Sequence, residues 1–162
     1  MPASRPFPRH NGRRYDAATS VGHQLFNLMA LMRREVDARM AAHGLTDAQW
    51  RPLWALKSGR AATAIELARV LSMDAGAVTR MVDRLAAKGL VERVRSSADR
   101  RVVHLRLSAE GDATVARVPP VLASVNNDFL RDFSQAEWQQ LMSLIARMTA
   151  HGTQLADARA AP

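Results

Sequence analysis

The sequence contains no cysteine. Disulfide bonds, cysteine-ligated zinc, thiol catalysis and thiol-based sensing of oxidants are therefore excluded. No apolar run approaches the roughly 18 residues that a membrane-spanning helix needs, and residues 1–8 lack the apolar centre of a secretory signal. We therefore expect a cytoplasmic protein that has no membrane partner.

Sequence motifs typical of enzymes are also missing. The five histidines are scattered along the chain, and none has the His-x-x-x-His spacing of a metal site. There is no glycine-rich phosphate loop and no nucleophile elbow. We expect neither catalysis nor a bound cofactor or metal.

Acidic residues are scarce in two parts of the chain. Residues 1–15 carry four arginines and no acid, and residues 60–107 carry ten basic and five acidic groups. Residues 108–162 reverse the balance, with four basic and six acidic groups. Concentrated positive charge attracts nucleic acid or an anionic membrane, and charge alone does not choose between them. Residues 1–15, which also hold three prolines, are predicted to be a disordered basic arm.

Apolar periodicity and capping motifs predict helix over most of the remaining chain. Capping-box sequences begin at Thr46, Thr63 and Ser134, and Asp74 and Ser108 are further N-cap candidates. The tail after residue 151 is expected to fray. The predicted helices cover residues 16–43, 47–57, 63–71, 74–88, 108–131 with a kink or break at Pro119-Pro120, and 134–151.

Two short segments, 91–95 and 103–107, alternate apolar and charged residues, as strands do. The polar, basic stretch between them predicts an antiparallel hairpin with a charged tip. A helix, a tight turn, a longer helix and a basic hairpin in this order are typical of a winged helix-turn-helix. The predicted fold class is therefore mainly α (α+β), divided into an arm (1–15), N-terminal helices (16–57), a DNA-binding domain (60–107), C-terminal helices (108–151) and a tail (152–162).

The helix predicted over 74–88 has the chemistry to enter the DNA major groove. Arg80, Arg84 and Lys88 are four residues apart and form one basic stripe, and arginine binds guanine as a bidentate donor. At the hairpin tip, Asp99 is expected to pair with a nearby arginine and hold the loop in shape for the minor groove. An ordinary solvated helix and a polar turn that touches nothing are the alternatives. The predicted DNA-binding residues are Ala75, Gly76, Ala77, Thr79, Arg80, Asp83, Arg84, Lys88, Asp99, Arg100 and Arg101.

These segments resemble the MarR family of transcriptional regulators. The resemblance is carried by Leu67–Leu71 with Val78–Leu85, by Lys88–Arg93 at the entry to the wing, and by Arg95, Asp99, Arg101, Leu107-Ser108 and Gly111. It implies a triangular homodimer whose N- and C-terminal helices interlock, and which reads a pseudo-palindrome in double-stranded DNA. It also implies repression that a small aromatic anion relieves. The sequence departs from the family at Gly76, where a serine or threonine is common, and at Pro119-Pro120.

In the family, small ligands often bind between the first two helices and the winged domain. Tryptophans beside an imidazole and a cation suit a small aromatic acid of the hydroxylated or pyridine type. The alternative is that the tryptophans are core residues and the histidine is a surface residue. The predicted ligand-binding residues are His23, Asn27, Trp50, Arg51 and Trp54.

The sequence thus predicts a ligand-responsive regulator of transcription that binds DNA as a homodimer. Two other classes stay open at this point. One is a winged-helix regulator that has no small-molecule ligand or that responds to a metal. The other is a helical interaction protein that has lost DNA binding.

Overall fold

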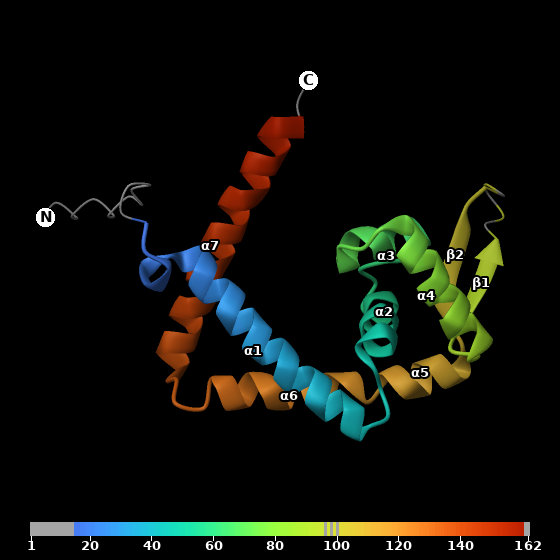
Figure 1. The fold of residues 1–162 in the computed structure, drawn as a ribbon, viewed down its shortest axis with the longest axis horizontal. Coiled ribbons are helices and arrows are strands. Elements are labelled where there is room, and N and C mark those ends of the chain that lie inside the picture. Colours follow the sequence, from blue (N-terminus) through green and yellow to red (C-terminus); the bar gives the residue numbers. More distant parts are fainter. Residues whose placement is uncertain (1–14, 96, 98, 100, 161–162) are drawn as a thin grey trace, which may run out of the picture. The chain divides into compact units, whose positions relative to one another are not determined.

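A computed structural model describes residues 15–95, 97, 99 and 101–160. Within them the fold is mainly helical with one two-stranded antiparallel sheet, which confirms the predicted class (Figure 1). No helix in this part of the chain has the length and apolarity to cross a membrane. The elements are η2 (Ala17–Thr19), α1 (Val21–Ala42), α2 (Asp47–Lys57), α3 (Ala64–Leu71), α4 (Ala75–Ala87), β1 (Val91–Arg95), β2 (Val103–Leu107), α5 (Ala109–Val115), α6 (Val118–Phe129) and α7 (Gln135–Ala160).

The chain forms two compact units, Met1–Val125 and Asn126–Pro162. The boundary between them falls inside α6, so it matches none of the predicted domain limits. Those limits describe functional regions and stay predictions. Residues 1–14 of the predicted arm lie outside the described residues.

The first long helix begins later than predicted. Instead of starting at residue 16, the chain makes the short turn η2, in which the carboxylate of Asp16 accepts the N–H of Ala18 at 2.9 Å. Ser20 then caps α1 by accepting the N–H of His23. Side chains of this kind compete for backbone donors, and that competition delays the helix by five residues.

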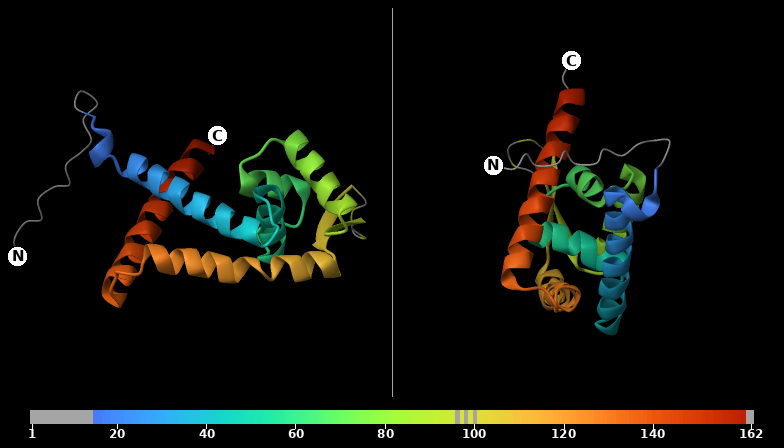
Figure 2. Two further views of the ribbon diagram at one scale, coloured as in Figure 1. Left: turned by 60° about the horizontal axis from the view of Figure 1, so that its bottom comes forward. Right: turned by 90° about the vertical axis from the view of Figure 1, so that its left-hand side faces the viewer.

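Helices α2, α3 and α4 and the β1–β2 hairpin, which we call the winged unit, are held together by an apolar core. Leu67 of α3 and Val78 of α4 are fully buried, and so is Leu53 of α2. The hairpin pairs Val91 with Leu107 through to Arg95 with Val103, in agreement with the predicted strands. On β2 the N–H of Leu105 also binds the carbonyl of Ala62, at 2.8 Å. Helix α4 packs beside β1 (Figure 2).

The double proline interrupts the helix that follows the wing, as predicted. α5 ends at Val115 and α6 begins at Val118, so Pro119 and Pro120 fall in the first turn of a new helix. That is the turn in which a missing backbone N–H costs least, because those donors have no partner inside the helix.

The last helix is longer than predicted. α7 starts after the Ser134–Glu137 capping box and continues to Ala160, whereas the prediction ended it near residue 151. The segment after Gly152 is rich in alanine, the best helix former, and one glycine does not stop a helix. None of the residues of α7 is buried.

Candidate nucleic-acid interface

Helix α4, which carries most of the predicted DNA contacts, is fixed at its two ends. At its start, the carboxylate of Asp74 accepts the N–H of Ala77 at 2.8 Å. At its end, Gly89 has a φ of +68°, a left-handed conformation that turns the chain into β1. Between α3 and α4 the turn passes through Ser72, which is also left-handed at φ 53°. The two helices pack on each other across this turn.

The predicted basic stripe lies on the exposed side of α4. The side chains of Arg80, Arg84 and Lys88 are exposed, and none of them belongs to an ion pair among the residues that the structure describes. Three exposed cations outside these ion pairs create a positive surface that attracts phosphate.

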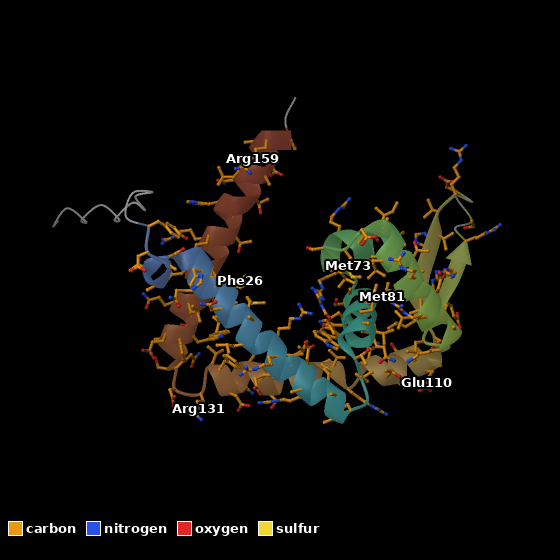
Figure 3. The ribbon with its side chains drawn as sticks, in the orientation of Figure 1. Phe26, Met73, Met81, Glu110, Arg131 and Arg159 are labelled. Atoms are coloured by element: carbon orange, nitrogen blue, oxygen red, sulfur yellow. The ribbon has the colours of Figure 1, made fainter. Side chains whose placement is uncertain are left out.

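The stripe borders the first turn of α2. Arg84 and Lys88 line a hollow of about 160 Å³ together with Thr46 and Gln49. Arg84 also lines a second hollow, of about 100 Å³, beside Met81. Figure 3 shows Met81 on the α4 side that faces α2. Arg84 and Lys88, in the second half of the stripe, therefore lie on the side of α4 that borders the start of α2.

The first turn of α4 is open because its residues are small. Ala75 and Gly76 are exposed and Ala77 is half-buried. A Cβ at Gly76 would lie 3.3 Å from Asp74 Oδ1 and 3.5 Å from Arg80 Nη1. A side chain at this position would thus be tight against the helix cap and in ordinary contact with the Arg80 guanidinium.

The two remaining predicted contacts on α4 already have partners within the chain. The hydroxyl of Thr79, an exposed residue, donates to the carbonyl of Ala75 at 2.9 Å. The carboxylate of Asp83 forms an ion pair and hydrogen bond with Arg93 of β1. Sequence reasoning missed Arg93, although strand alternation puts it on the same face as buried Val91.

The tip of the wing is shaped by Asp99. Its carboxylate accepts the backbone N–H of Arg101 at 2.9 Å, and its carbonyl accepts the N–H of Val102 at 2.9 Å. The loop is thus closed by a local turn, and the side chain of Arg101 is exposed. Arg100, the other predicted arginine at the tip, lies outside the described residues.

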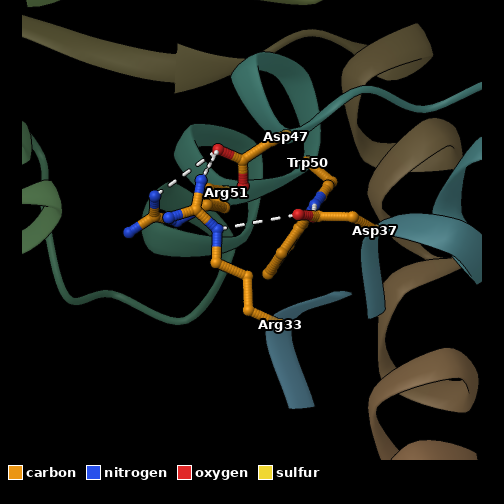
Figure 4. Close-up of polar contacts among 5 residues, drawn as sticks. All are labelled: Arg33, Asp37, Asp47, Trp50 and Arg51. Atoms are coloured by element: carbon orange, nitrogen blue, oxygen red, sulfur yellow. Dashed lines mark hydrogen bonds and ion pairs between the residues drawn. The ribbon is translucent and has the colours of Figure 1, made fainter. Parts of the chain in front are cut away.

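The predicted ligand-binding residues are spread over two helices. His23 and Asn27 are exposed on α1, whereas Trp50, Arg51 and Trp54 are half-buried on α2. A polar network joins the two helices (Figure 4). In it, Trp50 donates to Asp37 at 3.3 Å, and the Oδ2 atom of Asp47 lies 3.1 Å from Arg33 and 3.6 Å from Arg51.

A hollow of about 610 Å³ opens beside this network. Of the five predicted residues, Arg51 lines it, while Asn27 lines a neighbouring hollow of about 440 Å³. Sequence reasoning missed the other residues of the larger hollow, although the adjacent arginines at 33 and 34 were a signal. Its walls are Phe26, Met29, Ala30, Arg33, Arg34, Asp37 and Arg51.

A helix-turn-helix followed by an antiparallel hairpin makes this a winged helix-turn-helix protein. Within that class, the sequence model of the MarR family matches residues 45–103, from just before α2 to the first residue of β2. Together with the structural matches below, this shows that the chain is similar to members of the MarR family.

Solved structures of family members share the fold over most of their length. The reduced form of MarR from E. coli is 28% identical with a TM-score of 0.69, covering 80% of this chain and 96% of that one. The transcriptional regulator PA3341 is 29% identical with a TM-score of 0.75, covering 83% and 99%. A mutant of E. coli MarR complexed with operator DNA is 26% identical with a TM-score of 0.69, covering 81% and 94%.

Proposed function

We propose that the protein is a homodimeric repressor that binds a pseudo-palindromic operator through α4 and the wing. The observation that carries the proposal is the exposed row of Arg80, Arg84 and Lys88, which form no ion pair in the described part of the chain. A rigid helix with such a row fits the major groove, and the tip at Arg101 suits the adjacent minor groove. The MarR relative bound to operator DNA supports this assignment.

Uncovered apolar surface supports the dimer. α1 is divided: Val36 and Met40 in its second half are buried, whereas Phe26 in its first half is 72% exposed. On α7, residues such as Met142 and Ile145 are also exposed. Contiguous apolar faces of this kind mark protein interfaces, and a two-fold dimer would bring two recognition helices to successive half-sites.

The direct test is selection of bound duplexes from a random-sequence pool by the full chain. We expect enrichment of a pseudo-palindrome whose half-sites are about 10 base pairs apart, one helical turn. Recovery of no motif would favour a helical interaction protein without DNA binding.

We further propose that a small aromatic acid, hydroxylated or of the pyridine type, binds in the 610 Å³ hollow and releases the operator. Phe26 and Met29 offer an apolar wall. Arg34 has no ion pair in the described part of the chain and offers a cation to the carboxylate. Of the predicted contacts, Arg51 lines this hollow and Asn27 lines the neighbouring one, whereas His23, Trp50 and Trp54 line neither of the two.

Tryptophan fluorescence tests for ligand binding, because Trp50 donates a hydrogen bond to Asp37, which lines the hollow. A panel of hydroxybenzoates and pyridinecarboxylates should include acids that quench the fluorescence, and Arg34→Ala should weaken the quenching. If no acid changes the fluorescence while DNA binding is intact, the protein is a regulator without such a ligand.

A further inference from the structure

We propose that Asp83 and Arg93 form a brace that fixes the wing against the recognition helix, so that Asp83 is a positioning residue and makes no contact with DNA. The proposal rests on the proposed DNA binding. It assigns a role to the single acidic residue of α4, on a surface where an unpaired carboxylate would repel phosphate.

The strand register explains why the two side chains meet. Arg93 lies opposite Leu105, which is 5% exposed, and on the same strand face as buried Val91. Its aliphatic stem can therefore lie along an apolar surface while the guanidinium extends beyond it. There the Nη2 atom donates to Asp83 Oδ1 on α4.

The two strands of the wing are anchored in different ways. β2 is fixed by backbone contacts to the segment before α3. The N–H of Leu105 donates to the carbonyl of Ala62, and His104 forms an antiparallel β-bridge with Thr63. β1 is an edge strand. Within the described part of the chain, the pair of Asp83 and Arg93 is the polar link between β1 and α4. Without it, the outer strand would depend on its partner strand, on its base and on the apolar packing of Val91.

The brace orients the wing and adds little to the free energy of unfolding. Both side chains are about half exposed, at 55% and 43%, and exposed ion pairs contribute little to folding. A small tilt of β1 is nevertheless carried to the tip, where Arg101 has to reach DNA while α4 is seated in the groove. Loss of the pair should therefore reduce DNA affinity in a protein that folds normally.

A double-mutant cycle tests the brace. Asp83→Asn and Arg93→Gln, singly and together, are measured by fluorescence anisotropy on the selected duplex. Each single variant should bind roughly three- to fivefold more weakly, the double variant should be no worse than either, and the reversed pair Asp83→Arg with Arg93→Asp should recover most of the loss. Additive losses, or tighter binding by Asp83→Asn, would overturn the proposal.

A second measurement needs no DNA. Amide hydrogen exchange should be faster in Asp83→Asn at residues 93–95 and 101–103, with an unchanged melting temperature, and unchanged exchange there would overturn the brace. Arg84→Ala serves as the parallel variant. If it binds like the wild type, the proposed DNA face is wrong. If Arg84→Ala weakens DNA binding while the losses of Asp83→Asn and Arg93→Gln are additive, the brace is wrong and the proposed DNA face stands.

Discussion

At the scale of the residue, a few side chains fix the helix that supports α4. Glu66 closes the capping box of α3: its carboxylate accepts the N–H of Ala62 at 2.6 Å and that of Thr63 at 3.1 Å. The hydrogen bond from Ala62, followed by those from Thr63, lowers the pKa of Glu66 below its ordinary value of 4.5. The folded state therefore favours the charged carboxylate.

This pKa shift predicts a specific dependence of stability on pH. A carboxyl group whose pKa is lowered by folding stabilises the protein at pH values above 4.5, and the contribution is lost as the pH falls through the lowered pKa. Thermal unfolding of the wild type and Glu66→Gln should therefore differ near neutral pH and converge under acid conditions. A difference that stays constant with pH would contradict this role for Glu66.

The arginines of the interface give a second prediction. Arg84→Ala and Arg101→Ala should each weaken specific DNA binding by about 1–3 kcal/mol, because a base contact or an arginine in the minor groove is lost. Arg131→Ala removes the same charge from the other compact unit, at a side chain that is paired with Asp132, and should bind nearly as the wild type does. Equal affinity of all three variants would show that the DNA face is misplaced.

At the scale of the element, local sequence signals determined most of the fold. Thr63, Asp74 and Ser108 cap helices where they were predicted to, because an N-cap bond forms within three residues. The pair of Asp83 and Arg93 was missed because the two residues belong to different elements and meet through packing alone. The hollow at Phe26 and Arg34 was missed although its lining residues other than Arg51 all lie on α1. The DNA-contact set itself stays a prediction from sequence.

Gly111 gives a prediction for the joint between the wing and α5. A Cβ there would lie 1.9 Å from the carbonyl oxygen of Leu90, and that neighbour is backbone. Gly111→Ala should therefore push α5 away from the base of the wing and destabilise the protein by about 1–3 kcal/mol. Gly152→Ala is the matched control, because a Cβ meets nothing within 4 Å there. It should be neutral or slightly stabilising in the thermal melt.

At the scale of the whole molecule, the account requires a partner for α1 and α7. Ile145→Glu places a charge on an exposed apolar face that the dimer would bury, so sedimentation should show monomers where the wild type is a dimer. Gln140→Glu adds the same charge at an exposed polar position and should leave the dimer intact. A wild type that sediments as a monomer would contradict the two-fold arrangement.

The most direct test of the DNA-binding surface is the salt dependence of operator affinity. Neutralised phosphates release counterions, so the logarithm of the association constant should fall linearly and steeply with the logarithm of salt concentration. Loss of one phosphate contact should reduce the slope by about one, and we expect this for Lys88→Ala. A flat dependence for the wild-type protein on its selected duplex would contradict the assignment of α4 and the wing to DNA.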